Sequence, residues 1–184
     1  MSSNDRTNSQ RTQRPDTKAS YEHAMNLLDR RHVPTLDVGA GYGRSKLYYG
    51  WTTYEPYPRP GVSVDYTELA AVPGPWRAIA CVNVLNTVDW STRAIIVRQI
   101  YELLAEGGRA VFVTRNPKDV LKALAKGIAG EERHSVWTRM DTYQKGFSVD
   151  ELAAYLKTIL PLSTYIMPDP SGERPSVVIE RSHT

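Results

Sequence analysis

The sequence predicts an α/β protein with a mostly parallel sheet that ends in an antiparallel pair of strands. A buried strand at residues 33–38 runs into a glycine-rich loop and a helix. From there to about residue 130, apolar strand segments alternate with segments of helical periodicity, the order that builds a helix-covered parallel sheet. Residues 168–175 join the last two strand segments and are too few for a crossover helix, so these strands must pair antiparallel.

The individual elements follow from apolar spacing and from turn and cap residues. Strands are expected at residues 33–38, 51–55, 62–65, 77–82, 109–114, 162–167 and 176–180. Helices are expected at residues 21–31, 44–49, 91–104, 117–126 and 149–160. Ser20 is the expected cap of the first helix, Pro117 opens the fourth, and Ser148 with Glu151 forms a capping box at the fifth. Gly107-Gly108 is expected to end the third helix, and polar residues 131–146 are interpreted as a long loop or a weak strand.

Length and composition indicate one globular domain, taken as residues 19–184. The chain is 41% hydrophobic and 23% charged, and no apolar run approaches the roughly 20 residues of a membrane span. The first 18 residues lack the apolar stretch of a secretory signal, so we expect a cytoplasmic location and no membrane partner. Cys81 is the only cysteine, which excludes an internal disulfide and a thiolate-rich zinc site. We expect it to be a buried structural thiol, and no metal site is predicted.

Residues 1–18 are polar and hold four basic side chains against two acidic ones. Because they offer almost no apolar surface to a core, they are predicted to form a disordered basic tail. Weak contact between this tail and nucleic-acid phosphates is an alternative role, compatible with the net charge of +3.

The stretch most informative about function is Leu36-Asp37-Val38-Gly39-Ala40-Gly41-Tyr42-Gly43. Glycines at alternate positions after a buried strand let the backbone turn sharply and approach a ligand, and the next helix offers free N–H groups. A nucleotide-like ligand is therefore expected. In the dinucleotide fingerprint the third glycine would stand where this chain has Arg44, so the spacing argues against NAD.

This stretch resembles the first motif of class I S-adenosylmethionine-dependent methyltransferases, D-x-G-x-G-x-G, and the order of elements agrees from Tyr21 to Arg181. The resemblance implies a three-layer Rossmann-like fold, a mostly parallel seven-stranded sheet with an antiparallel C-terminal hairpin, and S-adenosyl-L-methionine as cofactor. Residues 142–147 additionally resemble putative methyltransferases associated with DNA phosphorothioation systems.

The resemblance also implies a set of cofactor-binding residues. Asp37 would help to hold the methionine amino group, and Gly39, Ala40, Gly41 and Gly43 would form the loop beneath methionine and ribose.

Four further residues belong to the predicted cofactor set. Glu55 would accept the ribose hydroxyls, the alternative being a surface glutamate before a proline-rich loop. Asp65 would face the adenine amino group, with Tyr66 beside the ring; here the alternative is an aspartate that starts a turn. Asn83, at the end of the strand at residues 77–82, would line the pocket.

The sequence assigns neither a catalytic residue nor a methyl acceptor. Residues 83–86 lack the two prolines of the amino-methylating DNA enzymes, and Cys81 does not follow a proline as the nucleophile of cytosine-C5 enzymes does. Among the four histidines, His134 is the best-placed candidate base. Candidates for the acceptor side are Asn86, Arg115, Asn116, Trp137, Tyr143 and Gln144.

Three classes of function remain open on the sequence. The first is a methyltransferase that acts on a nucleic acid, a protein or a small molecule. The second is a cofactor-binding module without transferase activity, and the third is an enzyme that cleaves S-adenosylmethionine.

Overall fold

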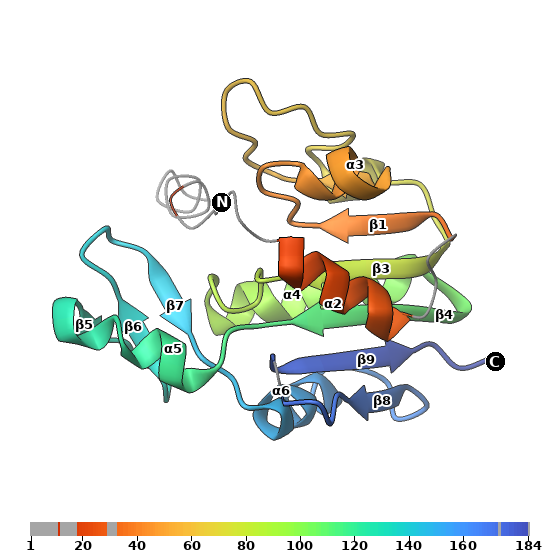
Figure 1. The fold of residues 1–184 in the computed structure, drawn as a ribbon. Helices are drawn as coiled ribbons and strands as arrows, with labels where there is room; N and C mark the ends of the chain where they lie inside the picture. The colour runs from red at the N-terminus through yellow and green to blue at the C-terminus, as the bar shows by residue number, and fades with distance from the viewer. Residues whose placement is uncertain (1–10, 12–17, 29–32, 173, 184) are drawn as a thin grey trace.

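A central sheet of six strands runs through the molecule (Figure 1). The computed structural model describes residues 11, 18–28, 33–172 and 174–183. In spatial order the strands are β2 (Thr52–Tyr54), β1 (Thr35–Val38), β3 (Trp76–Val82), β4 (Leu104–Val113), β9 (Ser176–Glu180) and β8 (Tyr165–Pro168). The first four are parallel, whereas β9 pairs antiparallel with both β4 and β8. The predicted parallel sheet with an antiparallel C-terminal pair is confirmed.

Helices cover both faces of this sheet, which gives the predicted three layers (Figure 1). The helices are α2 (Lys18–Leu28), α3 (Arg44–Tyr49), α4 (Trp90–Leu103), α5 (Pro117–Leu121) and α6 (Val149–Lys157). On one face α4 and α6 pack on Ile79 and Phe112. On the other face α2 packs on Ala80 and Val111. Alternate residues of the central strands thus feed two separate cores, as the pleat of a strand requires.

The strand expected at residues 62–65 does not form, so the described sheet has six strands rather than seven. Only an isolated bridge joins Tyr54 to Tyr66 at this edge. The Thr53 N–H, which would serve a neighbouring strand, instead donates to the Asp65 carboxylate at 2.9 Å. The Asp65 side chain thus accepts the hydrogen bond that a neighbouring strand would otherwise accept, as aspartate often does near turns.

A second, three-stranded antiparallel sheet lies where the sequence indicated a long loop or a weak strand. Its strands are β5 (Ile128–Ala129), β6 (Ser135–Trp137) and β7 (Tyr143–Lys145). All are shorter than the segments that periodicity can detect. Lys145 is buried because its ammonium group donates to Glu151 at 2.7 Å and to two backbone carbonyls. A buried lysine breaks the expected pattern of polar residues outside and apolar residues inside.

Several element boundaries also differ from prediction. The first helix begins at Lys18, so Ser20 lies inside it and is not its cap, and α5 ends at Leu121 before a short 3₁₀ turn at Leu124–Lys126. Gly107 and Gly108 fall within β4 rather than at a helix end. The capping box of Ser148 and Glu151 at α6 is confirmed. The predicted tail lies outside the described residues except for Arg11 and Lys18, as does the helix end at residues 29–31.

Candidate functional site

A cavity of about 870 Å³ opens along the carboxyl ends of β1, β3 and β4. Residues of the three-stranded sheet, of α4, of the start of α2 and of the segment after β2 also line it. The carboxyl edge of a parallel sheet is where ligands of α/β proteins bind, and the volume falls in the range of small-molecule sites. Five of the predicted cofactor residues line it: Gly39, Ala40, Gly41, Glu55 and Asn83.

The glycine loop between β1 and α3 has a backbone that favours glycine. Gly39, Gly41 and Gly43 have φ values of 81°, 55° and 64°, in the left-handed region. The Gly39 and Ala40 N–H groups both donate to the carbonyl of Tyr54, at 2.9 and 3.0 Å, which ties the loop to the end of β2. A Cβ atom on Gly39 would lie 2.3 Å from Val84 Cγ2. The loop therefore packs against the segment after β3 with no space for a side chain.

Gly39→Ala should lower the free energy of unfolding by about 2–3 kcal/mol, because it adds a steric conflict to an unfavourable φ. Gly61 is the matched control, since it has the same φ of 81° but a Cβ atom there would meet no other atom within 4 Å. Gly61→Ala should cost only the backbone term, about 1–2 kcal/mol. Urea unfolding of both variants measures the difference, and equal losses would contradict close packing of Gly39 on Val84.

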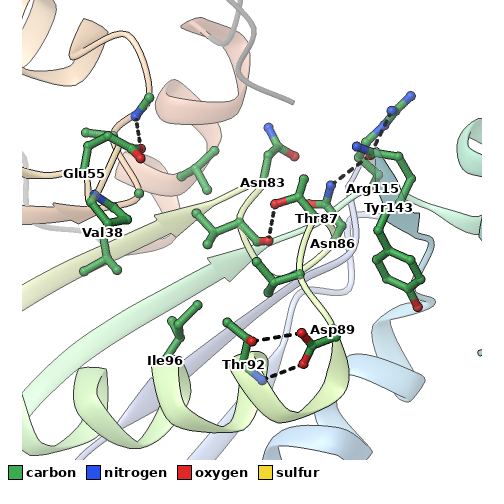
Figure 2. Close-up of a pocket in the computed structure, with 18 of the residues that line it drawn as sticks. Val38, Glu55, Asn83, Asn86, Thr87, Asp89, Thr92, Ile96, Arg115 and Tyr143 are labelled. Carbon is green, nitrogen blue, oxygen red and sulfur yellow. Dashed lines mark hydrogen bonds between the residues drawn. The ribbon is translucent and has the colours of Figure 1, made fainter. Parts of the chain in front are cut away.

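Glu55 holds the glycine loop through its carboxylate (Figure 2). It lies just after β2, is 3% exposed, and accepts from the Gly41 N–H at 2.9 Å and the Tyr57 N–H at 3.1 Å. A surface glutamate, the alternative interpretation, is therefore wrong. The position of Glu55 in the cavity wall is compatible with recognition of a pair of ligand hydroxyl groups.

Asp37 lies beneath the cavity and is not part of its wall. It is fully buried in β1, and its Oδ2 accepts from the Ser45 hydroxyl at 2.5 Å. Burial raises the pKa of the Asp37 carboxyl to about 7, and hydrogen bonds from Ser45 and Tyr21 only partly offset that effect. Contact with a methionine amino group stays a prediction for this residue.

Asp37 should make the protein less stable as the pH rises from about 4 to about 7. In that window the unfolded chain loses the Asp37 proton while the folded chain keeps it, so deprotonation favours unfolding. Asp37→Asn removes this titration. The stability of the wild type relative to Asp37→Asn should fall by at least about 1 kcal/mol between about pH 4.5 and about pH 6.5. Urea unfolding at both pH values measures it, and parallel pH profiles would contradict the raised pKa.

Three of the predicted cofactor residues besides Asp37 do not line the cavity: Gly43, Asp65 and Tyr66. Gly43 caps α3. The Asp65 carboxylate accepts from Lys46 Nζ at 2.6 Å and from Thr53, which accounts for it as a local structural residue. Tyr66 packs against the main core. Contact of these three residues with a cofactor stays a prediction.

The sequence missed part of the wall on α4. Ile95, Ile96 and Gln99 line the cavity, and Ile95 is 54% exposed while Ile96 also packs against the core. The run Ile95-Ile96-Val97 was a usable signal, because three consecutive apolar residues cover more of a helix than one core-facing stripe. Three tyrosines also line the cavity: Tyr42 in the glycine loop, Tyr54 at the end of β2 and Tyr57 just after it.

The acceptor-side candidates lie at the opposite end from Glu55 (Figure 2). Five of the six line the cavity: Asn86, Arg115, Trp137, Tyr143 and Gln144. Asn116 does not, because its side chain caps α5. Asn86 Nδ2 and Arg115 Nη1 each lie 3.5 Å from Gln144 Oε1. These two contacts join the segments after β3 and β4 to β7.

Candidate catalytic groups are sparse in the described residues. His134 does not line the cavity, and its Nδ1 faces Glu151 at 3.9 Å. His23 bonds with Ser176 at 3.0 Å, and His32 lies outside the described residues. Cys81 is fully buried and burial raises the pKa of its thiol, so the expected structural thiol is confirmed. In the described ranges, no cluster of three metal-ligating side chains occurs. Within the same ranges, every helix is too short or too polar to traverse a bilayer.

Comparison with known proteins identifies the class of fold. No family model matches the sequence, and no curated protein matches it either. A sugar N-methyltransferase from Streptoalloteichus sp. superposes with a TM-score of 0.58 at 13% identity, over 92% of this chain and 89% of the other. An amino pentose methyltransferase from Micromonospora echinaspora, solved with S-adenosylmethionine, gives 0.56 at 15% identity over 94% of each chain.

A third similar structure comes from Burkholderia thailandensis. It is a 1,6-didemethyltoxoflavin-N1-methyltransferase with bound S-adenosylhomocysteine, and it gives a TM-score of 0.59 at 16% identity over 91% of this chain and 78% of the other. The chain therefore has the Rossmann-like fold of S-adenosylmethionine-dependent methyltransferases. At these identities the likeness establishes the fold.

Proposed function

We propose that the protein is an S-adenosylmethionine-dependent methyltransferase. The observation that carries the proposal is the joint position of the glycine loop and the Glu55 carboxylate in one cavity wall, at the carboxyl edge of a sheet with the methyltransferase fold. The size of the cavity and its backbone cradle fit an adenosyl cofactor. When bound, this cofactor supplies an electrophilic methyl group.

The residues of the chain contribute binding and positioning. Gly39, Ala40 and Gly41 give close backbone approach, Glu55 accepts the ribose hydroxyls, and Asn83 forms the wall after β3. Holding a nucleophile in line with the methyl group supplies much of the rate in such displacements. Because similar solved structures include a sugar N-methyltransferase and a 1,6-didemethyltoxoflavin-N1-methyltransferase, we propose a small-molecule acceptor.

Other sequence-based expectations stay predictions. These are the association with DNA phosphorothioation systems, the cytoplasmic location, and nucleic-acid contact through residues 1–18.

The test follows the fate of a labelled methyl group. Calorimetry should show saturable binding of S-adenosylmethionine and S-adenosylhomocysteine to the wild type. Gly41→Val should abolish it while the fold persists, because a branched side chain is unfavourable at φ 55° and would enter the cavity.

Incubation of methyl-labelled cofactor with pooled small-molecule acceptors should then move label to an acceptor. Label that stays on intact cofactor would favour a binding module, and label on a cofactor fragment would favour cleavage. Absence of cofactor binding by the wild type at millimolar concentration would refute the proposal.

A further inference from the structure

Strand pairing brings two arginines of the cavity wall to neighbouring positions just beyond the paired ends of β4 and β9. Arg115 follows β4, Arg174 precedes β9, and both line the cavity. These strands pair antiparallel with Val113 opposite Ser176, and the Thr114 N–H donates to the Pro175 carbonyl at 2.9 Å. One residue further, the same register sets Arg115 opposite Arg174. The Cα atoms of opposite residues in an antiparallel pair are only about 5 Å apart, so the two positive side chains leave the backbone close together.

Neither guanidinium forms an ion pair within the described part of the chain. The Arg115 side chain has a long contact, 3.5 Å, with the neutral amide of Gln144. The Asp119 carboxylate interacts with Arg115 at longer range, and it is itself paired with Lys122 at 2.8 Å. Like charges at opposite positions of a strand pair destabilise a sheet. A bound anion would offset this repulsion and would accept hydrogen bonds from both guanidinium groups.

The acidic residues of the same cavity wall already have partners. Glu132 is held by Arg93 at 2.6 Å, and Asp89 caps α4 by accepting from Thr92 at 2.9 Å. Glu131 accepts from the Trp137 indole at 3.4 Å. The acidic side chains of this wall thus form no direct ion pair with either arginine, yet they would repel a chain of phosphates. This combination suits a single anionic group better than a nucleic acid.

The two arginines also lie far enough from the glycine loop to leave room for a small molecule between them. Adjacent strands lie about 4.8 Å apart, so β4 and β9 are roughly 10 and 14 Å from β1, where the glycine loop begins. Figure 2 shows Arg115 across the cavity from Glu55. An anionic group held at this end leaves the middle of the cavity to the rest of a small molecule.

We propose that Arg115 and Arg174 bind the carboxylate or phosphate group of a small-molecule methyl acceptor, whose nucleophile then lies toward the glycine loop. That the ligand is a methyl acceptor rests on the proposed function. The anion site itself rests on the strand register and the cavity wall.

The test titrates inorganic phosphate and oxalate without cofactor at constant ionic strength, above the second pKa of phosphate, where both are dianions. Arginine side-chain N–H signals in NMR spectra report binding. Arg115→Gln and Arg174→Gln should each weaken binding about tenfold or more, since each removes charge-assisted hydrogen bonds. The double variant should show no saturable response. Arg98→Gln is the matched control, because Arg98 is exposed on α4 and does not line the cavity.

The outcomes separate the anion site from methyl transfer. Binding of either probe that depends on both arginines supports the site, and the preferred probe assigns phosphate or carboxylate. Equal binding by wild type and double variant, or no binding of either probe by the wild type, overturns it. So does binding of a short single-stranded oligonucleotide, dependent on both arginines, without binding of either small probe. Phosphate binding by a wild type that fails to bind S-adenosylmethionine would refute the proposed function and leave the anion site standing.

Discussion

Glu55→Ala is expected to weaken S-adenosylmethionine binding by about 30- to 1,000-fold, the equivalent of roughly 2–4 kcal/mol. The change removes a charged acceptor from the cavity wall, where we propose that it receives two ribose hydroxyls. It also releases the Gly41 N–H, which now donates to Glu55 at 2.9 Å, so the glycine loop loses an anchor. Both effects reduce cofactor affinity. Calorimetry with the purified variant measures the loss.

The same substitution should also lower stability. Glu55 is 3% exposed and accepts from two backbone N–H groups, which alanine would leave without these bonds. We expect a loss of about 1–2 kcal/mol, since water in the cavity can partly replace the carboxylate. Glu55→Gln keeps the shape and one acceptor oxygen but not the charge. It should retain more stability than alanine and still bind the cofactor weakly.

Glu102 supplies the control for a general loss of negative charge, because it is exposed on α4 and does not line the cavity. Glu102→Ala should leave affinity within about twofold and stability within about 0.5 kcal/mol. Wild-type affinity in a folded Glu55→Ala protein would remove Glu55 from the proposed cofactor site.

Glu132→Ala should destabilise the protein by about 2–4 kcal/mol, because it leaves a buried arginine without its carboxylate partner. The Arg93 side chain is 1% exposed and donates to both oxygens of Glu132, at 2.6 and 2.8 Å. Burial by itself would raise the pKa of Glu132, but hydrogen bonds from Arg93 and Tyr143 outweigh it and lower that pKa. Glu132 is 27% exposed, so the loss should be smaller than for a fully buried pair.

The effect should reach the cavity, since this ion pair joins α4 to the loop between β5 and β6 of the three-stranded sheet. Urea unfolding measures the stability, and hydrogen exchange of the β6 and β7 amides should speed up in Glu132→Ala more than exchange in β3. Arg93→Met combined with Glu132→Ala should recover part of the stability, because no unpaired charge remains buried. Glu131→Ala, a change at the exposed neighbour, is the control. A loss no greater than that of Glu131→Ala would show that Arg93 is satisfied without Glu132.

Local features of the site were predictable from the sequence. The glycine loop follows from backbone requirements at Gly39, Gly41 and Gly43, which depend on φ and on the strand before them. Capping of α6 by Ser148 and Glu151 is local for the same reason. The side-chain roles were harder. Asp37 has the acidic position of the motif, yet its strand is covered on both faces and its carboxyl is buried beneath the loop.

The role of the Asp65 side chain was also not predictable from the sequence. Its place near a strand end suggested a ligand contact, but nearby donors, Thr53 and Lys46, were available to its carboxylate first. In the second sheet, Gln144 and Lys145 are buried although their residue types predict exposure. Each is satisfied by a partner that the chain brings from another element. Pairing between residues of different elements cannot be predicted from a short stretch of sequence.

The sequence by itself determined the layered α/β fold, the antiparallel C-terminal strands and the glycine loop after β1, because apolar period, turn residues and backbone angles act over a few residues. Only the tertiary structure decided how the cavity is walled. It buried Glu55 against Gly41, turned Ile95 into the cavity, and set Arg115 opposite Arg174. These contacts depend on strand register and helix placement between distant segments, which are fixed only when the whole core packs.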